Sequence, residues 1–302
     1  MHQPASIVTR LAAATALAIL LPSLLGAQAG TNSSGGYILD YLTGTVLCST
    51  TQSSSSGPTL YNCPTTASAG GTASGGGAAD NFSRYVAAGA VLTQSGPPGS
   101  MFEQVDGSGT VNSRLFIDGT PSADDQLVFH FLGTQSATFT GGSPSDFVTL
   151  QLDLSSNGTQ FALARDQRFA DGTGGLTLYN ARQTASGFDL FAPLTGGSFL
   201  DYTFRAVVEL IDYPDTDAGS KLTGSISLRL GGIDAVNSQG DPYASAVFSA
   251  VLDDQPGFAT ISLTTTPEPT SMALVATGLV GVVGVTRRKR KARRGSQTPS
   301  QH

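Results

Sequence analysis

Short runs that alternate apolar and polar residues dominate the chain between residues 36 and 263, and no long stretch has the period of a helix. Alternation with a period of two is typical of β-strands that bury one face. Many short strands separated by turn residues favour an all-β antiparallel β-sandwich or jelly roll over a parallel α/β sheet. The predicted strands are 36–46, 82–92, 114–117, 126–132, 147–154, 160–164, 176–179, 187–191, 199–211, 222–230, 246–252 and 259–263.

Turn-forming residues separate these runs. Ser156-Asn157-Gly158-Thr159 lies between two alternating segments and predicts a tight hairpin, because Asn and Gly accept the positive φ angles that such a turn requires. Glycine-rich segments at 141–144, 172–175 and 195–198 predict further turns. The segment 67–79 consists almost entirely of Gly, Ala, Ser and Thr, so we expect a loop or linker there, between N-terminal strands at 30–66 and a sandwich body at 80–265.

Cys48 and Cys63 are the only cysteines. An even cysteine count in an exported protein predicts a disulfide, and the spacing suggests a local disulfide hairpin. The polar segment between them is rich in serine, so a crosslink there is expected to stabilise the fold by about 3 kcal/mol.

The N-terminus has the three parts of a signal peptide. Arg10 ends a short basic region, residues 11–25 are apolar, and Ala27-Gln28-Ala29 has the small residues that a signal peptidase recognises. Residues 1–29 are therefore predicted to be removed after Ala29, which leaves Gly30 at the new N-terminus. The export machinery is an expected partner.

The C-terminus also has three parts. Pro267-Glu268-Pro269 interrupts any preceding strand, residues 270–286 are uncharged, and a basic cluster follows. The uncharged segment has seventeen residues, roughly 25 Å as a helix, against a hydrocarbon core of about 30 Å. We predict a single short transmembrane helix at 270–286 and a polar tail at 295–302. The basic cluster that stops transfer comprises Arg287, Arg288, Lys289, Arg290, Lys291, Arg293 and Arg294.

This ending, residues 266–294, resembles the PEP-CTERM family of bacterial sorting signals, which is also catalogued as a C-terminal domain of ice-binding proteins. The resemblance is carried by Pro267-Glu268-Pro269, by the glycines of the apolar segment and by Arg287-Arg288-Lys289-Arg290. It implies recognition by an exosortase, a membrane-embedded transpeptidase that cuts near the Pro-Glu-Pro. It also implies an inner-membrane intermediate that is passed to the cell surface or extracellular matrix. The rest of the chain has no regular Thr-x-Thr ladder, so the ice-binding label is not transferred to it.

The body between the two ends is acidic. Removing Arg10, the seven tail cations and Glu268 from the 16 basic and 22 acidic residues leaves 8 basic and 21 acidic residues. Nucleic acid is therefore not an expected partner, since phosphate binding needs a basic surface. Asp212, Asp215 and Asp217 lie within six residues of one loop and are a candidate Ca²⁺ site, although a plain solvated turn is the preferred explanation and no cofactor is required.

Signals of catalysis are few. His130 is the only histidine of the body, which argues against zinc sites and histidine-dependent triads. The body has no tryptophan and only two glutamates, Glu103 and Glu209, which disfavours glycoside hydrolysis. Sugar binding through tyrosine platforms remains an alternative. Its candidates are Tyr179, Tyr202, Tyr213 and Tyr243.

These observations favour a non-enzymatic, structural or adhesive protein of the cell surface or matrix. The alternatives are a polysaccharide-binding module, with or without calcium, and a glycoside hydrolase.

Overall fold

The computed structural model describes residues 30–40, 45–55, 57–68, 71–95, 102–213, 219–248 and 258–263. These residues form one compact unit that contains strands and turns only, as the alternating pattern predicted. The predicted signal peptide at 1–29 and transmembrane helix at 270–286 lie outside the described residues. Within the described ranges, no helix is long and apolar enough to span a membrane.

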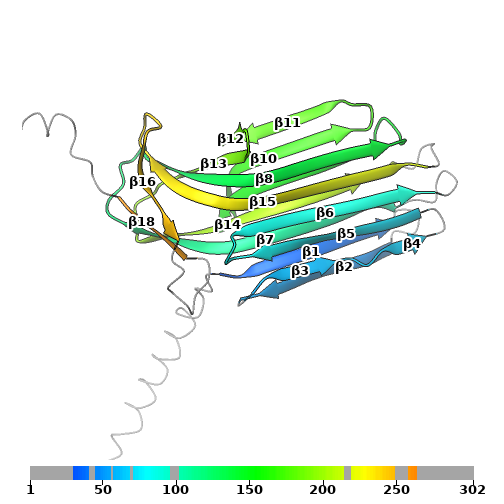
Figure 1. Ribbon diagram of the computed structural model, residues 1–302, viewed down its shortest axis with the longest axis horizontal. Coiled ribbons are helices and arrows are strands. Elements are labelled where there is room, and N and C mark those ends of the chain that lie inside the picture. The colour runs from blue at the N-terminus through cyan, green and yellow to red at the C-terminus, as the bar shows by residue number, and fades with distance from the viewer. Residues whose placement is uncertain are drawn as a thin grey trace, which may run out of the picture. The chain divides into compact units, whose positions relative to one another are not determined.

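Two antiparallel sheets pack face to face, which makes the unit a sandwich (Figure 1). The main path of the first sheet, sheet A, follows the order β11-β10-β9-β14-β7-β1-β2, and the path of the second, sheet B, follows β12-β13-β8-β15-β6-β5-β3. The strands of sheet A are β1 (Asn32–Asp40), β2 (Thr45–Ser54), β7 (Phe102–Asp118), β9 (Phe147–Ser156), β10 (Thr159–Phe169), β11 (Gly174–Tyr179), β14 (Phe199–Ile211), β17 (Val247–Phe248) and β18 (Phe258–Ser262). The strands of sheet B are β3 (Thr59–Asn62), β4 (Thr66–Ser68), β5 (Gly71–Asp80), β6 (Tyr85–Gln94), β8 (Gln126–Thr140), β12 (Ala181–Thr184), β13 (Gly187–Pro193), β15 (Lys221–Val236) and β16 (Pro242–Ser245).

Large side chains fill the centre of the sandwich. Phe131 of sheet B and Phe204 of sheet A meet edge to face with ring centroids 5.3 Å apart, and Phe129 and Tyr202 do so at 5.1 Å. All four side chains are buried. The predicted hairpin is confirmed, because Asn157 and Gly158 have positive φ angles and Thr159 pairs with Ser156.

The sandwich is thin on one side, where β1 and β7 face β5 and β6. Many inward positions there are small. They include Gly36, Gly75, Gly77, Gly107 and Gly109 on β1, β5 and β7, where backbone of the other sheet lies in close contact, and Ala88 and Ala90 on β6. A Cβ atom on Gly77 would lie 1.9 Å from the carbonyl oxygen of Ser108, and one on Gly107 would lie 2.2 Å from that of Gly76. Neither position can hold a side chain without moving a sheet, since real Cβ atoms do not approach this closely.

This packing corrects the prediction of a linker at 67–79. Residues 66–68 and 71–80 are strands β4 and β5, and β5 pairs with β6 along its whole length. The small residues are there because the facing sheet approaches so closely. The composition that suggests a flexible linker is here the composition of a packed strand.

The disulfide between Cys48 and Cys63 is confirmed, but the predicted local hairpin is wrong. Cys48 lies on β2 at the edge of sheet A, whereas Cys63 directly follows β3 at the edge of sheet B. Their Cα atoms are 6.0 Å apart. The bond therefore connects the two sheets and closes the thin side of the sandwich.

The two ends of the described unit share one edge of β7. Gly30, which follows the predicted signal cleavage site, donates its N–H to the carbonyl of Asn112 at 3.2 Å. Strand β1 pairs antiparallel with residues 102–111 of β7, and β18 pairs parallel with residues 114–118. Both ends are thus fixed to the same central strand.

Candidate functional site

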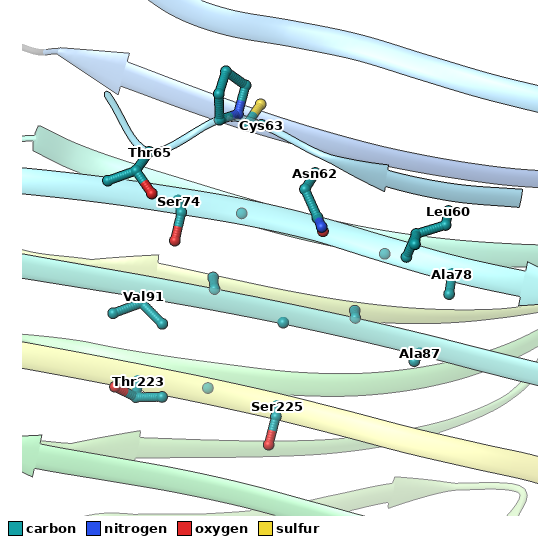
Figure 2. Close-up of a pocket in the computed structure, with 18 of the residues that line it drawn as sticks. Leu60, Asn62, Cys63, Thr65, Ser74, Ala78, Ala87, Val91, Thr223 and Ser225 are labelled. Carbon is teal, nitrogen blue, oxygen red and sulfur yellow. The ribbon is translucent and has the colours of Figure 1, made fainter. Parts of the chain in front are cut away.

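A shallow groove of about 690 Å³ crosses the outer face of sheet B near its thin side (Figure 2). It runs over β3, β5, β6 and β15. Its floor consists of outward-facing residues with small side chains or none: Ser74, Gly76, Ala78, Ala87 and Gly89. Strands β5 and β6 have small residues facing the other sheet, and they also have small residues on their outer face. The groove lies over these outer small residues.

The rim of the groove carries hydroxyl and amide groups. Figure 2 shows Asn62 and Thr65 on one side and Thr223 and Ser225 on the other. Tyr85 closes one end, with its hydroxyl 3.1 Å from the hydroxyl of Ser227. Leu60 adds an apolar side chain that is 68% exposed.

No Asp, Glu, Lys, Arg or His is among the described residues that line this groove. On a body with 21 acidic residues, this is a neutral surface. Donors and acceptors without charge, beside the aliphatic side chains of Leu60 and Val91 and the aromatic ring of Tyr85, suit a neutral polyhydroxylated ligand better than an ion.

The predicted calcium residues are only partly described. Asp212 is buried, 1% exposed, and its Oδ2 accepts a hydrogen bond from the Ser220 hydroxyl at 3.2 Å. Asp215 and Asp217 lie outside the described residues. Across the described ranges, no group of three or more His, Cys, Asp or Glu side chains is arranged to hold a metal ion. The calcium site at Asp212, Asp215 and Asp217 stays a prediction.

His130 lies on the outer face of sheet B between two carboxylates. Its Nδ1 is 2.8 Å from Asp189 Oδ1, and its Nε2 is 3.1 Å from Asp234 Oδ2. Arg182 also donates to Asp189. Burial by itself raises the pKa of Asp189, but the hydrogen bonds from Arg182 and His130 outweigh it and hold the pKa below its ordinary value. These ion pairs and hydrogen bonds connect β12, β13, β8 and β15, so the histidine has a structural role.

A second hollow, of about 540 Å³, is lined by residues of β8 and β10 and the turn after β10. Its charged groups bind each other, because Arg168 Nε donates to Asp166 Oδ1 at 2.7 Å and Gln135 Nε2 donates to Asp166 Oδ2 at 3.5 Å. This mutual pairing makes it a weaker candidate than the groove.

The tyrosines considered as sugar platforms are scattered. Tyr202 is buried in the core, and Tyr243 donates to Asp125 Oδ2 at 2.7 Å. Tyr179 and Tyr213 are exposed. None of the four lines the groove, whose tyrosine is Tyr85. A usable sequence signal was the continuous run of small residues at 72–78 and 87–90, since such a run leaves both faces of a strand without large side chains.

Two sets of predicted residues lie outside the described residues. They are the sorting residues Pro267, Glu268 and Pro269 with the basic cluster, and the signal cleavage residues Ala27 and Ala29. The roles predicted for them rest on the sequence.

Comparison with known proteins supports the interpretation of the C-terminus. Residues 265–290 match the model of the PEP-CTERM protein-sorting motif. No curated protein matches the chain. Among solved structures, an isomalto-dextranase of Arthrobacter globiformis T6 complexed with panose aligns at 10% identity, over 66% of this chain and 32% of that one. The chain thus spans about a third of that structure, and the TM-score of 0.10 gives no support for a shared fold or activity.

The chain carries a PEP-CTERM sorting motif, as its residues predicted. The motif implies an exported protein that exosortase-type machinery sorts at the membrane toward the cell surface.

Proposed function

We propose that the sandwich is a non-enzymatic, adhesive component of the cell surface or extracellular matrix, and that it binds an uncharged polysaccharide in the groove on sheet B. The observation that carries this proposal is the groove itself, a neutral, hydroxyl-rimmed surface on an acidic protein. The sorting motif, which implies placement toward the cell surface, is consistent with a ligand of the surrounding matrix.

The shape of the groove suits an extended chain. It crosses four neighbouring strands, which is three strand spacings or roughly 14 Å. Its floor lies on hydrogen-bonded strands, so the donors and acceptors along it are held in place before binding. Preorganisation of this kind lowers the entropic cost of binding a flexible polymer.

Ser74→Arg tests the groove. Ser74 points outward from β5 onto the groove floor, so an arginine there fills the groove and introduces a charge while leaving the core intact. We expect at least about tenfold weaker binding to purified neutral matrix polysaccharide, measured by affinity electrophoresis.

Gln126→Arg is the matched control. Gln126 is exposed on β8 of the same sheet, at the end of the strand far from the groove, and lines neither hollow, so this variant should bind as the unmodified protein does. Equal polysaccharide binding by the two arginine variants would contradict the proposal that the groove binds the polysaccharide. Reducing ends counted during the same incubations test the non-enzymatic part, because a hydrolase would increase them.

Calcium-assisted binding is the second candidate. The buried position of Asp212 beside Ser220 favours it, since a buried carboxylate at the start of an acidic loop is a good oxygen ligand. In that case, glycan retention would fail in a chelator and in Asp212→Asn, whereas the groove alone predicts no chelator effect.

Sorting makes its own prediction. Protein recovered from the producing cell surface should have an intact mass that begins at Gly30 and ends near Pro267-Glu268-Pro269. Replacing these three residues with alanine should leave a membrane-held chain that still ends at His302. A wild-type chain ending at His302 would contradict processing, and would leave the adhesive proposal standing.

A further inference from the structure

Two carboxylates face each other on the outer surface of sheet A. Asp106 on β7 and Glu209 on β14 are directly paired residues in the antiparallel register. Both side chains alternate with buried core residues, so both point outward on the same face. Like charges directly opposite each other on neighbouring strands are destabilising. The pair therefore requires a partner that offsets its charge.

The described neighbours offset this charge incompletely. Gln104 Nε2 donates to Asp106 Oδ2 at 3.0 Å and to Glu209 Oε1 at 3.3 Å. Asp106 Oδ1 is buried and has no hydrogen-bond partner. Burial, and then the charge of Glu209, raise the pKa of Asp106 to about 7. An unsatisfied acceptor in a half-buried acidic pair is a costly arrangement in the absence of a ligand.

A second, independent feature extends this acceptor-rich surface. Thr149 on β9 is the residue directly opposite Glu209 on its other side, so Thr149, Glu209 and Asp106 form one row across three strands. Thr149 faces outward, since Val148 and Leu150 on either side face the core, yet it is only 3% exposed. Its hydroxyl oxygen also has no hydrogen-bond partner.

The nearest charged groups do not neutralise the pair. Arg205 lies on β14, four residues before Glu209 and on the same face, and it lowers the pKa of Asp106 by its charge without forming an ion pair in the described structure. Other titratable groups on this face include Tyr37 on β1, Asp153 on β9 and Arg165 on β10, and Arg114 of β7 forms an ion pair with Asp201 of β14 farther along the same two strands. Tyr37 is opposite Asp106 in register, while Asp153 is paired with Arg205 and is two register rows from Glu209.

We propose that the outer face of sheet A binds a hard divalent cation, Ca²⁺ in the first instance, through Asp106 and Glu209. Hard cations prefer carboxylate, amide and hydroxyl oxygens; the row supplies carboxylates and a hydroxyl, and Gln104, two residues before Asp106 on β7, supplies an amide. Gln104 has its amide beside both carboxylates, and a half-turn of the amide places Oε1 where Nε2 now lies. Thr149, whose buried hydroxyl has no hydrogen-bond partner, lies on the far side of Glu209 in the same row. This site is separate from the groove on sheet B and from the predicted loop at Asp212, Asp215 and Asp217.

Proton competition gives the site a distinctive signature. Protons and Ca²⁺ compete for the same carboxylate oxygens, so calcium affinity should be lower at pH 5.5 than at pH 8. The metal-free protein should show the opposite trend in stability. Because the folded pKa of Asp106, about 7, lies above its ordinary value of 3.8, Asp106 favours the folded state at low pH, and this contribution is lost as the pH rises from about 4 to about 7.

The test uses the mature chain, stripped of metal and titrated with CaCl₂ at pH 8 and at pH 5.5 by calorimetry, with the Tm measured in parallel. We expect saturable binding that raises the Tm at pH 8 and is weaker at pH 5.5. In Asp106→Asn and Glu209→Gln, calcium affinity should fall at least about tenfold. Without metal, Asp106→Asn should have a higher Tm than the unmodified protein at pH 8, which also shows that this variant folds.

Two controls separate this site from other acidic positions. Asp153→Asn removes another carboxylate with a raised pKa from the same face and should leave calcium affinity unchanged. Asp212→Asn reports on the predicted loop site. Binding that is lost in Asp212→Asn and unchanged in Asp106→Asn would assign calcium to the loop and overturn the proposal, as would the absence of any calcium-dependent Tm shift at pH 8.

Discussion

Gly77→Ala is expected to destabilise the sandwich by about 1–3 kcal/mol, although alanine usually suits a strand better than glycine does. The added Cβ would lie 1.9 Å from the Ser108 carbonyl oxygen of the opposite sheet and 2.3 Å from the carbonyl carbon. Both atoms belong to the backbone, so no rotamer change relieves the contact. The two sheets must separate locally, which weakens packing around Gly75 and Gly107 as well. Urea unfolding monitored by tyrosine fluorescence measures the change in midpoint.

Gly89→Ala is the matched control. Gly89 lies on β6 of the same sheet but faces outward, and a Cβ there meets only the Gly224 carbonyl oxygen at 3.8 Å. Alanine at position 89 should therefore be neutral or slightly stabilising, because it reduces the freedom of the unfolded chain. If Gly77→Ala and Gly89→Ala unfold at the same urea concentration, the backbone contact between the sheets does not limit stability.

Removal of the disulfide is the second large effect. The double variant Cys48→Ala/Cys63→Ala is expected to lose about 3 kcal/mol, because the bond closes a loop of 15 residues in the unfolded chain. The loss should be concentrated at the thin side, where the bond joins β2 of one sheet to the residue after β3 of the other. Hydrogen exchange should accelerate in β2 and β3 well before it accelerates in β14 and β15.

Reduction of the wild-type protein provides the control for the alanine variant. Cys63 is buried and Cys48 packs against the core, so the two thiols and the two alanines differ slightly in packing, while the crosslink is absent from both. The free energies of unfolding of the two forms should agree within about 1 kcal/mol. An oxidised wild type no more stable than either form would mean that β2 and β3 are held by packing alone.

Much of the fold was predictable because alternation is a local property. The strand predicted at 199–211 has these same bounds in the structure, and the hairpin at Asn157-Gly158 follows from residues that accept positive φ. The disulfide followed from a count of two cysteines in an exported chain. In each case, the neighbouring sequence contains the physical cause.

What the sequence did not predict depends on distant partners. Strand β5 was read as a linker because Gly and Ala lose much entropy on ordering and bury little area. Its stabilising partner is the backbone of β7 in the other sheet, which sequence spacing does not reveal. The same holds for the groove, since Leu60, Tyr85 and Thr223 become neighbours only when β3, β6 and β15 lie in one sheet. Asp106 and Glu209 likewise meet only through the register of β7 and β14.

The parallel pairing of β18 with β7 has a mechanical consequence. The sorting motif begins two residues after Leu263, so any pull on the C-terminal end enters the sandwich through β18. A hairpin pulled at its open end separates one hydrogen bond at a time. A pull along β18 instead loads its five register pairs with β7 together, and the Leu263 N–H bonded to the Asp118 carbonyl at 2.7 Å adds a sixth contact. A load applied at this end is therefore shared by the whole strand.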